Sequence, residues 1–239
     1  MKRIFLVVFS LTLLCGGAGN VSGAPFVIDD DPLGANTYWG GIRFGNSDTD
    51  EDVLLEDSYD IRRMEISFNG TRMTVKIIGD YFSKHPYDGG DLYLSSKGWS
   101  VSGTAPHYIS DTFTQGEGWD YVITRTGINE ATVFGLDFSK IGWSGGGGTY
   151  RSHQAWRDGY DKNNPVQTGG TFDIGTDWIA FGFDTKDLGL GPTFGLHFTM
   201  SCGNDVIEGE VPGTPVPEPS VALFLICGLV GLAIRKRKQ

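Results

Sequence analysis

Hydrophobic and polar residues alternate along much of the middle of the chain, which is the pattern of half-buried β-strands. The clearest case is RRMEISFNGTRMTVKII at 62–78, where the alternation runs through 64–68 and resumes through 73–77. Between the two runs, Asn69-Gly70 supplies two residues that tolerate the positive φ angles of a type I′ turn. This segment therefore predicts a β-hairpin with its turn at Asn69-Gly70.

Further strand-like runs follow at similar spacing, and turn clusters rich in Gly, Pro, Asn and Asp separate them. They cover 91–95, 119–125, 131–138, 149–156, 177–184 and 194–201. Many short strands joined by polar turns are typical of an all-β sandwich, and no repeat of fixed period indicates a solenoid or propeller. We expect an antiparallel β-sandwich of jelly-roll-like type.

The two ends of the chain have a different pattern. Two basic residues, the apolar run at 4–14 and a stretch of small residues predict a signal peptide, with a signal helix, over 1–24. The β-sandwich domain is then expected over 25–209 and a proline-rich linker over 210–219. Residues 220–239 predict one short transmembrane helix and a basic tail. Its apolar run, Val221 to Ile234, would rise about 21 Å as a helix, against a hydrocarbon core of about 30 Å.

Charge and cysteine usage narrow the classes of function. Residues 25–217 contain 13 lysines and arginines against 28 aspartates and glutamates, so their formal net charge is −15. Such a surface repels phosphate backbones, and we expect no nucleic-acid partner. Cys202 is the one cysteine of this segment, which excludes an internal disulfide after processing.

The C-terminal tail carries three features in a fixed order: a Pro-Glu-Pro motif, the short apolar run and a basic cluster. Together they resemble the PEP-CTERM sorting signal of Gram-negative bacteria, here over 216–239. The residues that carry the resemblance are Pro217, Glu218 and Pro219, followed by Arg235, Lys236, Arg237 and Lys238.

The resemblance implies a route out of the cell. Signal peptidase and exosortase are the expected processing partners, and the membrane is a transient one. The basic cluster is expected to stay on the cytoplasmic side. After processing, the protein is expected at the cell surface or in the extracellular matrix, in a biofilm and exopolysaccharide context. The resemblance implies no activity for the β domain.

Acidic residues suggest a cation site at 46–52. Asp48, Asp50 and Asp52 alternate there, and carboxylates at this spacing are typical of calcium loops. The loop departs from the EF-hand pattern, since Tyr59 stands at the twelfth position, and a solvated acidic loop is the alternative. We predict weak Ca²⁺ binding here as the one candidate cofactor.

Aromatic residues in or next to predicted loops suggest carbohydrate binding, since sugar rings stack on such side chains. Four are candidates because polar groups accompany them: Tyr38, Trp39, Trp156 and Tyr160. No catalytic motif is present, and no catalytic residue is predicted. We expect a non-catalytic surface or matrix protein that binds polysaccharide. The alternatives are a secreted glycan-active enzyme, a lyase or glycosidase, and a purely structural surface module.

Overall fold

The structure is a computed structural model of the 239-residue chain. It describes residues 24–30, 42–43, 60–85, 89–103, 108, 111–114, 118–144, 151–201 and 203–213. The predicted signal peptide, the acidic loop at 46–52 and the PEP-CTERM-like tail lie outside these ranges.

Ten strands form one continuous antiparallel sheet, in the spatial order β1-β3-β4-β12-β11-β7-β6-β5-β13-β14. This confirms the all-β, antiparallel character that the sequence predicts. In chain order the strands are β1 (Phe26–Asp29), β3 (Ile61–Asn69), β4 (Arg72–Gly79), β5 (Leu92–Ser95), β6 (Tyr121–Arg125), β7 (Glu130–Gly135), β11 (Pro165–Ile174), β12 (Trp178–Asp184), β13 (Thr193–Thr199) and β14 (Val206–Pro212).

The predicted hairpin is present as β3 and β4, but its turn lies one residue later than expected. Asn69 pairs with Arg72, so Gly70 and Thr71 form the two-residue loop. Gly70 has φ +62°, and glycine at the first loop position is typical of a type II′ turn. Moving the turn by one residue leaves the same side chains facing inward, so the alternation alone could not distinguish the two turns.

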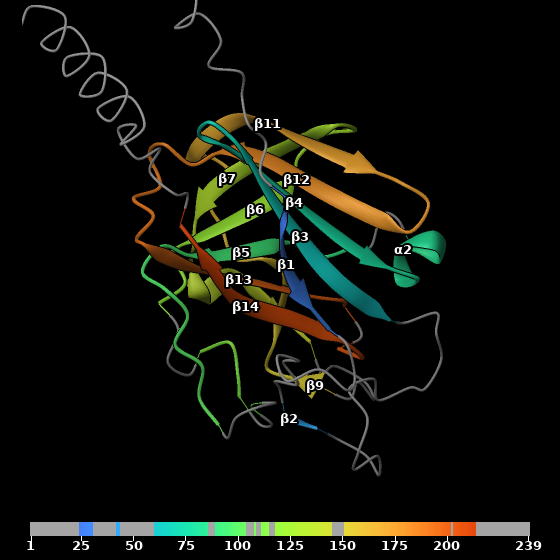
Figure 1. The fold of residues 1–239 in the computed structure, drawn as a ribbon. Coiled ribbons are helices and arrows are strands. Elements are labelled where there is room, and N and C mark those ends of the chain that lie inside the picture. The colour runs from blue at the N-terminus through green and yellow to red at the C-terminus, as the bar shows by residue number, and fades with distance from the viewer. Residues whose placement is uncertain are drawn as a thin grey trace, which may run out of the picture.

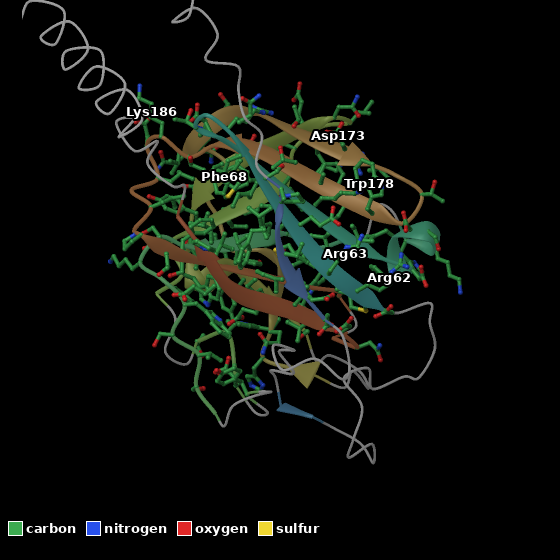
Figure 2. All side chains as sticks on the ribbon, in the orientation of Figure 1. Arg62, Arg63, Phe68, Asp173, Trp178 and Lys186 are labelled. Atoms are coloured by element: carbon green, nitrogen blue, oxygen red, sulfur yellow. The ribbon has the colours of Figure 1, made fainter. Side chains whose placement is uncertain are left out.

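The sheet curls so that its two edge strands meet. β1 contacts β14 (Figure 1). The side chain of Ile28 on β1 packs on Gly209 of β14. The enclosed side chains form the main core, in which Phe68 of β3 meets Phe194 of β13 edge-to-face at 6.4 Å. The outer face of β3 and β11 carries exposed polar residues such as Arg63 and Asp173 (Figure 2). The architecture is sandwich- or barrel-like because opposite parts of one sheet face each other.

A second apolar cluster covers the other face of β5, β6 and β13. Its buried members are Tyr93, Phe113, Trp119, Val122, Phe134, Ile141 and Ala155. Side chains alternate across a strand, so Leu92 and Leu94 enter the main core while Tyr93 enters the second cluster. Burial on both faces explains why every residue of β5 is buried.

Small elements complete the second layer. β8 (Ile141–Trp143) pairs with β10 (Ala155–Asp158), and β2 (Ile42–Arg43) pairs with β9 (Arg151–Ser152). The helices of the described residues are one turn of α-helix, α2 (Tyr81–Lys84), and one 3₁₀ turn, η2 (Phe138–Lys140). None of the helices in the described ranges has the length and apolarity to cross a bilayer.

Two long strands lie where the sequence indicates turns or linker. β11 is central in the sheet, yet most of its residues are exposed or polar and its register with β7 shifts twice. β14 continues to Pro212, and so it extends into the segment predicted as linker at 210–219. The strand predicted over 149–156 is divided into β9 and β10 at His153, whose φ is +67°.

Candidate functional site

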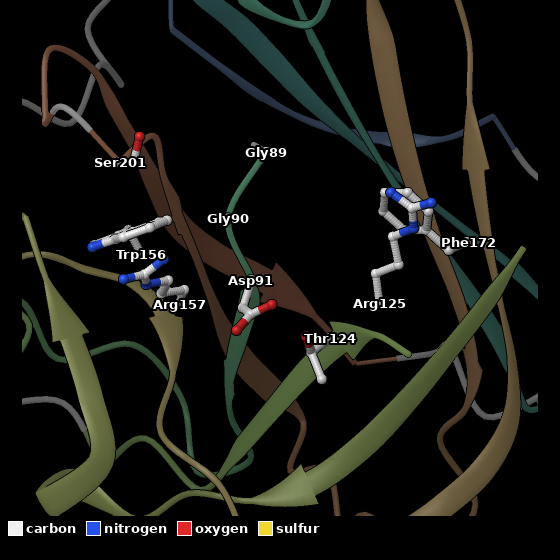
Figure 3. A pocket seen from close by; sticks show the side chains of 9 residues that line it. All are labelled: Gly89, Gly90, Asp91, Thr124, Arg125, Trp156, Arg157, Phe172 and Ser201. Carbon is white, nitrogen blue, oxygen red and sulfur yellow. The ribbon is translucent and has the colours of Figure 1, made fainter. Parts of the chain in front are cut away.

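A cavity of about 350 Å³ opens where β5, β6, β10 and β11 come together. This volume is within the range of small-molecule sites. Figure 3 shows Trp156 and Arg157 on one side of the cavity, Arg125 and Phe172 on the other, and Asp91 between them. The full lining is Gly89, Gly90, Asp91, Thr124, Arg125, Trp156, Arg157, Phe172 and Ser201.

Glycine is required where the chain enters this cavity. Gly90 has φ +74°, and a Cβ at this position would lie 2.7 Å from the carbonyl oxygens of Thr199 and Trp156. Real Cβ atoms do not approach that closely, and the positive φ disfavours other residues as well. Gly90 therefore lets the backbone pass between β13 and β10 and places Asp91 at the floor of the cavity.

Asp91 is fixed by three hydrogen bonds to its surroundings. Its N–H donates to the Trp156 carbonyl at 2.7 Å, and its Oδ2 accepts from the Asp158 N–H at 2.7 Å. The Thr124 hydroxyl bonds the same carboxyl group. Asp91 thus holds both ends of the short segment that presents Trp156.

Burial changes the acidity of Asp91. The residue is 7% exposed, and desolvation raises its pKa from 3.8 to about 7, against the opposing effects of the hydrogen bonds and of Arg157. A substantial fraction of Asp91 is therefore neutral at pH 7. The cavity floor can donate a proton in a hydrogen bond as well as accept one.

Trp156 forms an aromatic plate on one wall. The ring is half-buried, and the Arg157 guanidinium Cζ lies 4.0 Å from the ring centroid. Arg157 is itself held by an ion pair with Asp158, with Nε and Oδ2 3.5 Å apart. In Figure 3 Arg157 and Ser201 lie on opposite sides of the ring. A cation–π contact of this kind orients the ring and the guanidinium together.

Arg125 forms the opposite wall and borders a second hollow. Its guanidinium lies over Phe172 at 5.3 Å, and its Nε donates to the Gly127 carbonyl at 2.9 Å. The second hollow, of about 270 Å³, is lined by Arg125, Thr126, Phe134, Tyr160 and Lys162. Arg125 lines both hollows, so they are neighbours along one surface.

Tyr160 connects the two hollows through hydrogen bonds. Its ring stacks on Phe134 with centroids 4.4 Å apart. The Thr124 hydroxyl bonds both Tyr160 and Asp91. Burial raises the pKa of Tyr160, and the nearby Asp91 charge adds to the effect. Tyr160 is therefore a neutral hydroxyl beside a stacked ring at pH 7.

Two of the four predicted glycan-stacking residues, Trp156 and Tyr160, line these adjacent hollows. The other two, Tyr38 and Trp39, lie outside the described residues and stay predictions. The same holds for the calcium candidates Asp48, Asp50 and Asp52 and for the sorting residues Pro217, Glu218, Pro219, Arg235, Lys236, Arg237 and Lys238. Within the described ranges, no group of three or more His, Cys, Asp or Glu side chains is arranged to hold a metal ion.

Of the nine described residues that line the first cavity, sequence reasoning identified only Trp156 as a site residue. The charged residues that it missed are Asp91, Arg125 and Arg157. A signal existed for two of them. Asp91 ends an acidic, glycine-rich segment directly before a strand, and Arg157 follows Trp156 in the chain. Arg125 carries no such signal, because its position at the cavity depends on how β6 meets β11.

A second buried polar group, the His197–Glu208 pair, lies outside the cavity lining and connects strands. His197 Nε2 donates to the Ala155 carbonyl at 2.9 Å, and its Nδ1 lies 2.7 Å from Glu208 Oε2. Trp99 Nε1 donates to the other carboxyl oxygen at 2.6 Å. Burial lowers the pKa of His197 to about 4 and raises that of Glu208 well above its usual value, so the pair is neutral. His197 and Glu208 are both about 0–1% exposed, and their bonds tie β13 and β14 to β10.

Known proteins provide no assignment for this site, because no family model, no curated protein and no solved structure matches the chain.

Proposed function

We propose that the protein is a non-catalytic, exported surface or matrix protein that binds polysaccharide in the cavity beside Trp156. The observation that carries the proposal is the combination of a half-buried indole with hydroxyl, guanidinium and carboxyl groups around one cavity. An aromatic face accepts the apolar side of a sugar ring. Groups such as Thr124, Arg125 and Asp91 bond the hydroxyls that project from the ring edge.

The architecture supports the same function. In this proposal the domain is a β-sandwich of jelly-roll-like type, a group that includes lectin domains. Its site is built from strands that are fixed by the two apolar clusters, and rigid elements hold binding groups more precisely than mobile loops.

In this proposal, the signal peptide and the C-terminal tail direct the protein to the cell surface. Residues 1–24 direct export, and exosortase then recognises Pro217-Glu218-Pro219 while Arg235, Lys236, Arg237 and Lys238 hold the short helix at the cytoplasmic side. The domain is then released or attached at the surface of a Gram-negative cell, where polysaccharide is available.

A glycan-active enzyme is the second candidate, and one observation favours it. Asp91 has a pKa of about 7, which suits general acid catalysis near neutral pH. A glycosidase of the common type needs two carboxyl groups across the scissile bond. Asp91 is the one carboxyl group in the described lining of the cavity, so binding is favoured over hydrolysis.

The test compares Trp156→Ala with Trp178→Ala in the full-length chain, purified in mild detergent. Trp178 is an apt control because it is also half-buried on a strand, with Lys76 Nζ 4.7 Å from its ring centroid, and it does not line the cavity. If stacking covers roughly 60 Å² of apolar surface at ~25 cal/mol per Å², Trp156→Ala weakens binding by about 1.5 kcal/mol, or about tenfold.

Binding is measured by affinity electrophoresis through gels that contain a panel of soluble polysaccharides, and reducing ends are assayed in parallel. Retardation that Trp156→Ala reduces and Trp178→Ala does not supports the proposal. Retardation that survives in Trp156→Ala, or none with any glycan, contradicts it. Release of new reducing ends would favour the enzyme instead.

A further inference from the structure

The turn of the hairpin formed by β3 and β4 places an asparagine directly before a glycine. Asn69 ends β3, Gly70 and Thr71 form the loop, and all three residues are exposed. The backbone nitrogen of a residue can attack the side-chain amide of an asparagine before it, and glycine hinders this attack least because it has no Cβ. Among the asparagines that the structure describes, Asn69 is the one that precedes a glycine.

The two reacting groups of this pair are not engaged elsewhere. Within the described ranges, no hydrogen bond involves the side-chain amide of Asn69 or the N–H of Gly70. In a two-residue hairpin the first loop residue stands outside the ladder, so its exposed N–H is open to water. The nitrogen can therefore lose its proton to the solvent, and no bond holds the amide away from it.

The local geometry leaves room for the two groups to meet. Asn69 pairs with Arg72 in the ladder, and extended backbone holds the next nitrogen away from Cγ, so the intervening peptide group has to rotate first. Gly70 has φ +62°, and a Cβ built on it would find nothing within 4 Å. Because glycine changes its φ at little cost and no neighbour blocks it, this rotation is possible without unfolding of the hairpin.

We propose that Asn69 undergoes spontaneous deamidation in the folded protein. The Gly70 nitrogen loses its proton and bonds to Cγ of Asn69, and the amide group leaves as ammonia, which closes a succinimide ring. Water then adds to either ring carbonyl and opens the ring. The products are aspartate and isoaspartate, and in isoaspartate the main chain runs through the former side chain. Asn69 lines neither of the two hollows, so the reaction is independent of the proposed function.

The two products affect the hairpin differently, because Thr71 ties the turn to the end of β12. The Thr71 carbonyl accepts hydrogen bonds from the N–H of Thr185 at 2.8 Å and from its hydroxyl at 2.7 Å. The Thr71 side chain bonds the carboxylate of Asp184. Isoaspartate lengthens the backbone of a two-residue turn by one methylene and so displaces Thr71 from these partners, since loop length fixes the register. Aspartate keeps the backbone and the bonds.

The full-length chain in mild detergent is incubated in mildly alkaline buffer, both folded and unfolded in guanidinium chloride, and is then digested at mildly acidic pH. Mass spectrometry of the peptides follows the replacement of the Asn69 amide by a carboxyl group, and a protein isoaspartyl methyltransferase with labelled methyl donor identifies isoaspartate. Asn129 and Asn163 are internal controls, since both are exposed and neither precedes a glycine. We expect Asn69 to react at least about tenfold faster than these controls, at a folded rate within about tenfold of the unfolded rate.

Variants connect the rate to the turn. Gly70→Ala adds a Cβ in open space, and it is expected to slow the reaction of Asn69 at least about tenfold, folded and unfolded alike, while the two internal controls are unaffected. Asn69→Asp reproduces the aspartate product and is expected to keep the melting temperature of the wild type. Aged wild-type protein that contains isoaspartate should show an additional fraction that melts at lower temperature.

Three results would overturn the proposal or part of it. If Asn69 stays intact in the folded chain while the unfolded chain converts, the turn is rigid enough to protect it and the proposal fails. Equal rates at Asn69 and the internal controls, or a rate that Gly70→Ala leaves unchanged, also overturn it, because the glycine would then not direct the reaction. Aged protein that contains isoaspartate at Asn69 but melts as fresh protein does keeps the site and overturns its effect on the hairpin.

Discussion

Asp91→Asn should change how the stability of the protein depends on pH. Asp91 has a pKa of 3.8 in the unfolded chain and about 7 when folded, chiefly because burial disfavours its charge. A raised carboxyl pKa contributes stability that is fully present below pH ~4 and lost as the pH rises through about 7. At about 1.4 kcal/mol per pKa unit, the complete loss is about 4 kcal/mol.

Asparagine removes this titration while it keeps the local hydrogen bonds. Its amide oxygen can accept the Asp158 N–H, and its amide nitrogen can donate to the Thr124 hydroxyl. Between pH 5 and pH 8, the linkage relation predicts that ionisation of Asp91 alone lowers the free energy of unfolding of the wild-type protein by about 2–3 kcal/mol. The difference in unfolding free energy between Asp91→Asn and wild type should grow by that amount over the same range.

The assay is urea unfolding followed by tryptophan fluorescence at pH 5, 6, 7 and 8. All other titrating groups are common to both proteins, so the difference between them isolates Asp91. Asp137→Asn is the control, because hydrogen bonds from Ser139 and Lys140 lower the pKa of Asp137. Stability from a lowered pKa is lost only as the pH falls below this range, so its difference from wild type should stay flat. Parallel profiles for Asp91→Asn and wild type would refute the reasoning.

Three further predictions concern the backbone, the acidic loop and the tail. Gly90→Ala should lower the free energy of unfolding by about 2 kcal/mol or more, since its Cβ would meet two carbonyl oxygens at 2.7 Å. Gly70→Ala is the control, because Gly70 also has a positive φ but nothing lies within 4 Å of its Cβ. It should lower the free energy of unfolding by about 1 kcal/mol in the same urea assay. Millimolar Ca²⁺ should raise the melting temperature if residues 46–52 bind it, and equal melts in calcium and EDTA would argue against the site. Intact mass spectrometry of the protein from its native cells should show a mature form without Arg235–Lys238, and a retained Gln239 would contradict processing.

The strands that could be predicted are those that bury apolar side chains on at least one face, and those with one buried face give the clearest alternation. The alternation of Met64, Ile66 and Phe68 identified β3 because these side chains pack in or against the main core while the polar residues between them do not. β11 could not be found in this way. It takes its place from its pairing with β7 and β12, and most of its side chains are exposed. A strand that contributes backbone hydrogen bonds and little apolar surface leaves almost no periodic signal.

The candidate site, too, could be predicted only in part from the sequence. Trp156 and Tyr160 could be proposed because aromatic residues beside polar ones are visible in the sequence. Their partners Thr124 and Arg125 lie more than 30 residues away in the chain and reach the cavity through the sheet order. The raised pKa of Asp91 depends on burial, which only the folded structure defines.

The hydrogen bonds of buried Asp91 also fix the backbone on either side of Trp156, and this affects how readily the cavity can bind a ligand. Asp91 bonds the carbonyl of Trp156 and the N–H of Asp158, while His197 bonds the carbonyl of Ala155 on the other side. Three backbone groups around one indole are thus fixed to the sheet and to the second apolar cluster. A ring held in this way loses little freedom when a ligand stacks on it, and preorganisation of this kind lowers the entropic cost of binding. A cavity of this size is then sufficient for a sugar polymer, because each unit needs only modest affinity when many units are available along the polymer.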